Sequence, residues 1–438
     1  MSQSFKPNMT FSQIINMNVG FLGIQYSFGL QQTAINPIYS FLGANPDQLP
    51  LLNLAGPMTG LLIQPIIGAI SDKTWSPRWG RRKPFFLIGA MFCSICLFLF
   101  PFSSQLWMAV GLLWILDAAN NTAMEPYRAF VADKLNDKQQ SIGFMTQSFF
   151  TGLGITLANF SLYFFQNLFP TKLTETASNT IPIWVYGSFM IGAVVSITSV
   201  LFSVLKTPEI PPTDEELQKM KQEKMNLFSP FIEVFSAIRT MPKVLLKLAL
   251  VYLFQWYAMF CYWQFITLSL AKSLYQCDQS NKPYYEMAVG WTGIVNGFYN
   301  IVTVVSAYFL ARLAMKYAPK TIHAVSLLLA GVGLMAMPMI HQQYLTLLPM
   351  VGLGIAWASI MGIPYLIVVS DIPKEKYGVY MGIINMMIVI PMLIQTVSFK
   401  YVYNSFLGSN PNMAIVFAGI LLLIAAMLTM NIGNKKAI

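Results

Sequence analysis

Long apolar segments, separated by short polar stretches, run along almost the whole chain. Each segment holds about 20 or more residues, the length that an α-helix needs to cross the ~30 Å core of a bilayer. The pattern predicts an all-α membrane protein with twelve transmembrane helices. We expect them at residues 11–42, 48–71, 84–102, 106–132, 142–167, 182–204, 245–272, 287–312, 320–340, 343–369, 377–406 and 412–432.

The composition agrees with a membrane protein. Of the 438 residues, 55% are hydrophobic and 10% are charged, whereas a soluble domain has about 25% charged residues. The mean hydropathy is +0.56. The first apolar segment lacks the basic start and the small-residue cleavage site of a signal peptide, so we expect it to stay in the protein as a membrane span.

The basic residues predict the orientation in the membrane. If the N-terminus is cytoplasmic, most of the 27 lysines and arginines lie in cytoplasmic loops, as the positive-inside rule requires. Lys172, Lys272, Lys282 and Lys400 then lie outside. We expect a multi-pass protein of the inner (plasma) membrane with both termini in the cytoplasm. The net charge of +10 follows from this topology, and basic residues scattered over short loops do not indicate a nucleic-acid partner.

Two parts of the sequence are similar at a distance of 238 residues, and each ends a span just before a short basic loop. The matched residues are Pro126, Tyr127 and Asp133 in the first part and Pro364, Tyr365 and Asp371 in the second. This repeat predicts one six-helix bundle over 1–204, a cytoplasmic linker over 205–243 and a second six-helix bundle over 244–438. Parallel halves of this kind place a substrate site between them, near the midplane.

The fourth predicted span has charged and amide side chains in its interior. Asp117, Asn120, Asn121 and Arg128 lie on one side of a helix with 100° per residue. A charge at the bilayer centre costs about 2.5–3.5 kcal/mol, so such residues face a cavity or the bundle interior and indicate a functional site. Asp117 lies near the midplane, where a carboxylate is placed to bind and release a proton. Arg128 lies ~16 Å farther along the helix and cannot contact it.

Glu125 precedes Arg128 by three residues, a spacing that permits an ion pair on one face of the helix. Such a pair would either belong to the pathway of a solute or only fix the packing of the helix. The residues alone leave both interpretations open.

Neutral polar side chains form a stripe on the first span, and aromatic side chains gather in the seventh. Gln25, Gln32 and Asn36 are spaced by seven and four residues and share one side of a helix. Amides donate and accept hydrogen bonds, which suits uncharged solutes rich in hydroxyl groups. Trp256 and Trp263 offer flat apolar faces for sugar rings, although packing against lipid or other helices is the alternative for each aromatic residue.

The loop between the second and third spans concentrates charge around a glycine. Asp72 is followed by Gly80, Arg81 and Arg82, and Asp133 ends the fourth span on the same side of the membrane. Gly80 permits a tight turn. We expect these residues to form a cytoplasmic gating cluster that stabilises the outward-open state. A simple topology signal is the alternative for the arginines.

Three segments resemble one transporter family. GIQYSFGLQQTAINPIYSFLG (23–43), AGPMTGLLIQPIIGAISDKTWSPRWGRRKPFF (55–86) and LDAANNTAMEPYRAFVAD (116–133) resemble the first, second and fourth spans of proton-coupled sucrose and maltose transporters. This family belongs to the major facilitator superfamily and is related to the glycoside-pentoside-hexuronide:cation symporters. The segment QSFFTGLG (147–154) is most similar to the bacterial branch. The similarity covers about the first 165 residues, and the second half matches mainly in its pattern of spans.

The resemblance implies roles for two residues. Asp117 matches an aspartate implicated in proton coupling, and Arg128 matches an arginine implicated in sugar transport. Glu125 departs from the small or amide residue of the plant members. The counterpart of the charged loop in the second half, ARLAMKYAPK, has lost the motif.

Together these features predict a secondary active transporter that moves a disaccharide or related glycoside with protons by alternating access. The alternatives are a transporter of another small polar solute and a membrane receptor that binds sugar without moving it. An enzyme is not expected, because no nucleophile, base and orienting group occur together. No nucleotide-binding loop is present, and the only histidines, His323 and His341, make no metal site. We expect a monomer in the lipid bilayer, with no cofactor.

Overall fold

The computed structural model describes residues 6–169, 181–213, 215, 217–218, 241–314, 316–368 and 377–433. Most of the predicted linker, 205–243, lies outside these residues, as does Asp371 of the internal repeat. Over the described ranges every named element is a helix.

The first half of the chain forms helices whose bounds are close to the predicted spans. They are α1 (Phe11–Asn18), α2 (Gly20–Phe41), η1 (Pro46–Gln48), α3 (Leu49–Leu52), α4 (Ala55–Asp72), α5 (Lys83–Leu99), η2 (Phe100–Phe102), α6 (Leu106–Lys134), α7 (Asp137–Leu168) and α8 (Ile183–Lys206). The predicted first span is divided at Val19, and the second is divided at residues 53 and 54.

The second half repeats this organisation. Its helices are α11 (Lys243–Leu274), α12 (Lys282–Ala314), α13 (Pro319–Ala336), η3 (Met337–Met339), η4 (Gln343–Thr346), α14 (Leu347–Val368), α15 (Tyr377–Ser405) and α16 (Pro411–Met430). In the described part of the chain, ten helical segments are long and apolar enough to cross a membrane. Helices α2 and α6 are 22 and 29 residues long but more polar. The number of twelve spans stays a prediction.

Local sequence explains several helix ends. The Thr10 side chain accepts a hydrogen bond from the main-chain N–H of Gln13 at the start of α1, and the Gln13 side chain accepts one from the main-chain N–H of Thr10. Asn136 and Asn410 cap α7 and α16 in the same way. These side chains satisfy N–H groups that have no partner inside the helix, so each span begins where the polar residue stands.

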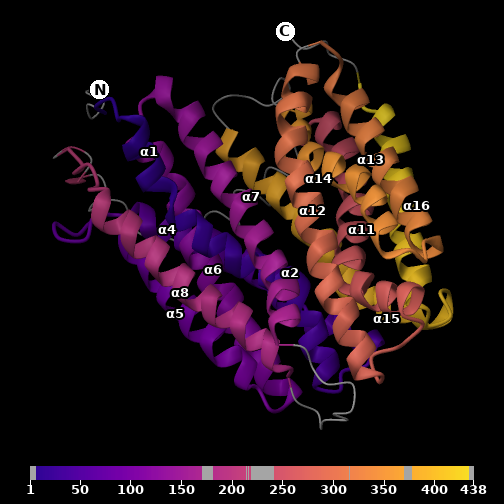
Figure 1. Cartoon of the computed structure of the whole chain (residues 1–438). Helices are drawn as coiled ribbons and strands as arrows, with labels where there is room; N and C mark the ends of the chain where they lie inside the picture. The colour runs from indigo at the N-terminus through magenta and orange to yellow at the C-terminus, as the bar shows by residue number, and fades with distance from the viewer. Residues whose placement is uncertain are drawn as a thin grey trace.

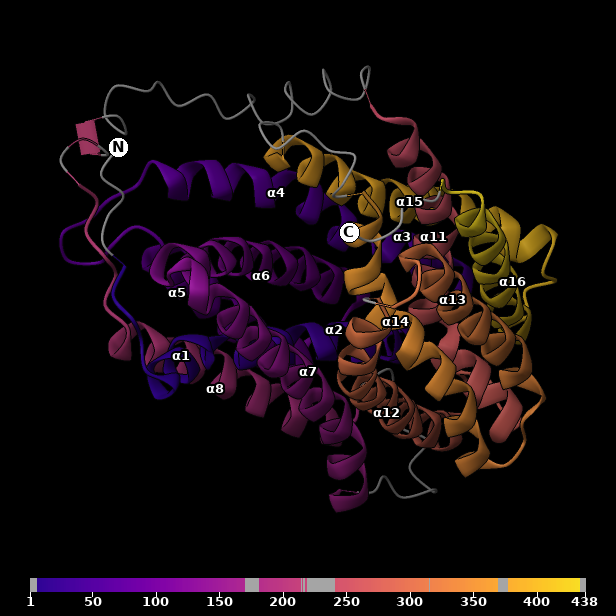
Figure 2. The ribbon, with the colours of Figure 1, turned by 90° about the horizontal axis from the view of Figure 1, so that it is seen from above.

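The helices form two bundles. Helices α1 to α8 pack mainly on one another, as do α11 to α16. Figure 1 shows the two groups side by side, indigo to magenta on one side and orange to yellow on the other, and Figure 2 shows them from above. Both ends of the chain lie at the same end of the molecule, which we call the termini end. The other is called the far end.

The two bundles meet mainly through α7 and α12. A Cβ atom on Gly293 of α12 would lie 2.4 Å from the main-chain oxygen of Asn159, and one on Gly297 would lie 2.2 Å from the Phe160 ring. Glycine therefore allows the close approach. The buried Asn296 donates to Thr33 of α2 over 2.8 Å, which adds a hydrogen bond between the bundles.

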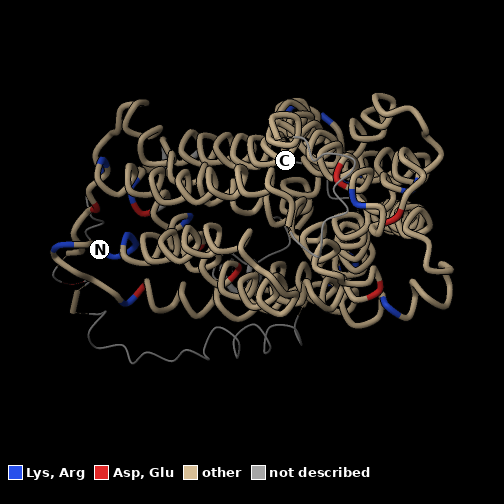
Figure 3. The backbone as a smooth tube through the Cα atoms, turned by 60° about the horizontal axis from the view of Figure 1, so that its bottom comes forward, with Lys and Arg blue, Asp and Glu red and all other residues tan. Residues whose placement is uncertain are grey.

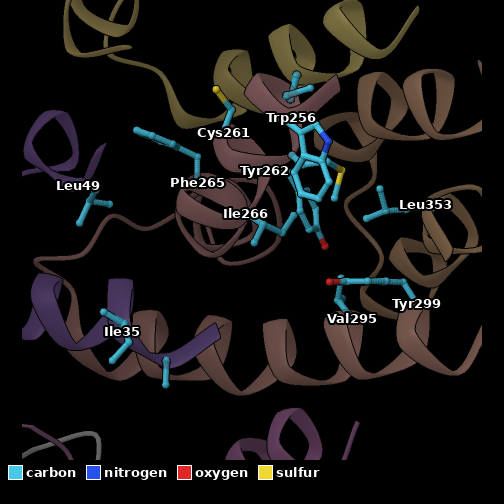
Figure 4. Packing of buried hydrophobic residues seen from close by; sticks show 14 of the residues in the cluster. Ile35, Leu49, Trp256, Cys261, Tyr262, Phe265, Ile266, Val295, Tyr299 and Leu353 are labelled. Carbon is cyan, nitrogen blue, oxygen red and sulfur yellow. The ribbon is translucent and has the colours of Figure 1, made fainter. Parts of the chain in front are cut away.

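One apolar core continues across this contact. Figure 4 shows buried residues of this core from both bundles, among them Ile35 of α2, Tyr262 and Phe265 of α11 and Val295 of α12. The surface is apolar as well, since side chains such as Val397 are 76% exposed. Figure 3 shows long uncharged stretches of helix between charged positions. An apolar surface of this extent fits a bilayer as the surrounding medium.

Candidate functional site

A cavity of about 900 Å³ lies between the bundles. It is lined by residues of α2, α4 and α6 from the first bundle and of α11, α14 and α15 from the second. Its lining extends from Asn53 and Trp263 near the far end to the exposed Asp72 and Arg128 near the termini end. The cavity is therefore open toward the termini end, and its size suits a small molecule, for which sites of about 300–1,000 Å³ are typical.

Asp117 lies in the wall of this cavity and is 5% exposed. It faces α4 at Gly56, where a Cβ atom would lie 3.6 Å from the carboxylate Oδ2. Asp117 forms no ion pair with another described residue. An acidic side chain buried between membrane helices without an ion-pair partner marks a candidate functional position.

Asn121, one turn after Asp117, is held by hydrogen bonds between α4 and α6. Its Nδ2 donates to Thr59 Oγ1 over 3.1 Å and to the main-chain oxygen of Asp117 over 2.9 Å. Its Oδ1 accepts from Gln64 Nε2 over 2.6 Å. Asn121 lines the cavity, but both of its amide hydrogens are used within the protein. Gln64 also lines the cavity and was not singled out from the sequence.

Two of the predicted binding residues lie away from the cavity. The buried Gln25 contacts the sulfur of Met124 at 3.9 Å, and Asn120 donates to Ser27 over 2.8 Å. Neither belongs to the described residues that line the cavity. Adjacent residues on a helix point 100° apart, so Asn120 faces α2 when Asn121 faces the cavity. The part of α2 that holds Gln25 packs inside the first bundle, so direct substrate contact by either residue has no support here.

The far end of the cavity is closed by amides. Gln32 and Asn36, two of the predicted binding residues, line the cavity. Asn53, at the break between α3 and α4, donates to Asn36 Oδ1 over 2.6 Å and to the main-chain oxygen of Leu49 over 2.7 Å. Asn36 in turn donates to the main-chain oxygen of Trp263 over 3.4 Å, which links α2 to α11.

Three tryptophans form the opposite wall. Trp256 and Trp263 of α11 both line the cavity, and Trp357 of α14 packs edge-on against each of them. The ring centroids lie 5.8 Å and 5.4 Å from that of Trp357. Trp263 Nε1 donates to the hydroxyl of Tyr299 over 3.4 Å, whereas the buried Nε1 of Trp256 has no hydrogen-bond partner among the described residues.

Glu125 and Arg128 line the cavity closer to the termini end. The ion pair considered from their spacing is not formed in the structure, although both residues are described. Glu125 is half-buried and Arg128 is exposed. An ion pair to an exposed side chain contributes little free energy, so the spacing of three residues was an insufficient guide.

The predicted gating residues come together within the first bundle. Arg81 and Arg82 lie 3.0 and 2.6 Å from the carboxylate of Asp72, and Arg82 lies 2.9 Å from that of Asp133. Burial alone would lower the pKa of Arg82, but the negative charges of Asp133 and Asp72 raise it above its ordinary value. Asp72 stays 55% exposed and lines the cavity.

Glu209, which follows α8, completes the cluster. Its carboxylate accepts hydrogen bonds from the main-chain N–H groups of Arg81, Arg82 and Lys83 over 2.8–2.9 Å. It therefore caps the N-terminus of α5, where negative charge is favourable. Gly80 has φ +79°, and a Cβ atom there would lie 2.5 Å from Glu209. Only glycine fits this turn. Glu209 was missed because nothing in a polar stretch of sequence marks it.

Comparison with known proteins supports the fold. The chain is similar to a sucrose transport protein of Oryza sativa subsp. indica, 23% identical over 482 residues that cover 95% of this chain and 88% of the relative. A general alpha-glucoside permease of Schizosaccharomyces pombe is 27% identical over 282 residues, 60% of this chain and 48% of that protein.

Solved structures of transporters have a similar fold. The nucleoside transporter NupG aligns with a TM-score of 0.70 at 13% identity, covering 97% of this chain and 99% of NupG. A D-xylose–proton symporter aligns with a TM-score of 0.64 at 13% identity, covering 97% and 98%. At this identity the likeness shows a shared fold. The model of the Major Facilitator Superfamily matches residues 17–396. With a cavity between two bundles and this match over most of its length, the chain belongs to the Major Facilitator Superfamily, and it is a multi-pass membrane transporter, not an enzyme.

Proposed function

We propose that the protein is a proton-coupled symporter of an uncharged disaccharide or related glycoside, and that it works by alternating access as a monomer in the plasma membrane. The termini end faces the cytoplasm in this proposal, so the structure is open to the inside. The observation that carries the proposal is the cavity itself, in which the buried Asp117 shares a central space with neutral amides and tryptophans.

The lining favours a neutral polyhydroxyl substrate. Gln32 and Gln64 supply amide groups for hydroxyls, and Trp256 supplies an apolar face together with an unpaired N–H donor. A buried donor without a partner is costly, and because this Nε1 atom is shielded from the cavity here, a ligand oxygen reaches it only after the wall rearranges. The similarity to a sucrose transport protein and to an alpha-glucoside permease points to the same class of solute.

Charge argues against anionic sugars. Among the described residues that line the cavity, Asp72, Asp117 and Glu125 carry acidic groups and Arg128 carries the basic one. Asp72 is ion-paired with Arg81 and Arg82, and Arg128 balances Glu125. An ionised Asp117 therefore leaves the lining net negative, which repels a sugar phosphate or a uronide. A neutral sugar meets no such barrier.

Proton coupling follows from the cost of moving a bare charge. When the cavity is closed at both ends, an ionised Asp117 without an ion-pair partner would be sealed inside the membrane, which is unfavourable. Binding of one proton together with the sugar removes this cost. The loaded carrier can then change conformation.

The test is uptake by the purified protein in proteoliposomes, with labelled sucrose and maltose and an imposed pH gradient. We expect uptake that rises when the outside is more acidic and disappears when an ionophore collapses the gradient. Uptake that ignores the gradient would contradict proton coupling. Binding of sugar without any uptake or exchange would favour a receptor, and failure of every glycoside to bind would point to another polar solute.

A further inference from the structure

The two bundles are joined by charge at the far end of the molecule. Lys400 of α15 lies with its Nζ 3.1 Å from Oδ2 of Asp47 in η1. Asn404, one turn later on α15, donates to the same oxygen over 3.4 Å. Asp47 therefore has two donors from successive turns of one helix of the other bundle.

Local structure holds Asp47 in place. It lies in the first turn of η1, which begins with a capping box between Asn45 and Gln48. The side chain of Asp47 is 23% exposed, whereas that of Lys400 is 60% exposed. The acidic partner is thus fixed and half-buried, and the basic partner reaches it from the membrane surface.

The ion pair lies beyond the closed end of the cavity, where the two bundles are in contact. Helix α15 contacts η1 and α3 near Asp47. Farther toward the termini end, Gln64 and Gly68 of α4 and Asn385 of α15 lie on the wall of the cavity. Helix α15 therefore touches the first bundle at the far end. Nearer the termini end, α15 and α4 face one another across the cavity. To open the far end, this contact has to separate.

We propose that Asp47 and Lys400 form a latch on the far end, closed when the cavity opens toward the termini and broken when it opens the other way. This inference rests on the alternating access of the proposed function, but it does not depend on the identity of the substrate. The pair is formed in the conformation seen here, and it lies where the bundles must part for a solute to enter from the far side.

A partly exposed ion pair is weak, and that suits a latch. Such pairs change an equilibrium by about 1.5- to fivefold, enough to favour one conformation without trapping it. Because the interaction is screened by salt, the effect should shrink as ionic strength rises.

The experiment measures opening of the far end without any substrate. Leu61 of α4 lines the cavity, so a Leu61→Cys variant with Cys277→Ser reports access of a membrane-impermeant maleimide. Labelling is measured from the far side in membrane vesicles. We expect Lys400→Glu and Asp47→Lys each to raise the labelling rate about three- to fivefold or more, and the double exchange of the two charges to return it toward the starting value.

Lys272 provides the matched control. It is an exposed lysine in the last turn of α11, at the same end of the molecule. Lys272→Glu makes the same change of charge away from Asp47 and should leave labelling unchanged. If charge reversal impairs folding, Lys400→Gln and Asp47→Asn provide milder variants, for which a smaller increase is expected.

Unchanged labelling in the single variants, or a double exchange that fails to restore the starting rate, would overturn the latch. Since labelling needs no sugar, a protein that transports no glycoside but shows the expected labelling pattern would retain the latch and lose the proposed substrate. The reverse outcome would retain the symporter and lose the latch.

Discussion

Replacement of Asp117 by asparagine tests the coupling directly. Asparagine has nearly the same shape, so the packing against Gly56 of α4 is kept, but the side chain can no longer bind or release a proton. Each pH unit corresponds to a tenfold ratio of proton activity, so symport with one proton sustains about 100-fold accumulation of a neutral sugar at a gradient of two units. With Asp117→Asn the limit falls to about 1. Exchange of labelled for unlabelled sugar should persist, because it requires no net proton movement.

Two assays on the same proteoliposomes distinguish these outcomes: uptake with an imposed pH gradient, and counterflow without one. Glu125→Gln is the matched control, since it neutralises another carboxylate of the cavity wall and should leave gradient-driven accumulation intact. Arg128→Ala should impair both assays if Arg128 serves the pathway itself. Wild-type accumulation by Asp117→Asn would refute the coupling role, and loss of accumulation in Glu125→Gln would assign it to Glu125 instead.

Four further predictions concern the cavity wall, the turn at Gly80, the cap on α5 and the charged cluster. Trp256→Phe keeps an aromatic face but removes the unpaired N–H donor, so sugar binding measured by calorimetry should weaken by about 0.5–1.5 kcal/mol, and unchanged affinity would place the donor outside the site. Gly80→Ala forces a side chain into a left-handed turn and against Glu209, which should lower the free energy of unfolding by about 1–2 kcal/mol or more and lower the melting temperature. Glu209→Ala should lower the free energy of unfolding by about 1–2 kcal/mol through loss of the cap on α5. We also propose that Asp72, exposed toward the cavity, gains a partner from the second bundle when the termini end closes, so Asp72→Asn should increase cysteine labelling from the termini side; an unchanged pattern would favour a simple topology signal.

The sequence was sufficient to predict the fold because a bilayer imposes a length on each apolar run. The predicted span 106–132 compares with α6 at Leu106–Lys134, and 412–432 with α16 at Pro411–Met430. Broken spans were harder: nothing in the apolar pattern marks the interruption at Val19 or the one at Asn53, because a short break changes hydropathy very little.

The site was predicted less completely than the fold. Helical periodicity correctly groups polar residues on one face, and Asp117 and Gln32 do line the cavity. Periodicity does not show which helix or cavity a face meets. Gln25 was therefore predicted to bind substrate, although it is buried inside the first bundle. Trp357 was missed because one tryptophan in an apolar run resembles ordinary packing, and its position is set by Trp256 on a distant part of the chain.

The close contact between α7 and α12 has a consequence for how the halves can move. Interlocked side chains hold two helices in one register, and shifting them requires many simultaneous rotamer changes. At Gly293 the backbone of α12 lies directly against the backbone of α7, and at Gly297 it lies against the Phe160 ring. Because α12 has no side chains at these two positions, few side-chain contacts have to change when one helix tilts slightly against the other. The contact that joins the bundles is thus also suited to be the axis of their rotation, and a bulky residue at Gly293 would push the two helices apart along that axis.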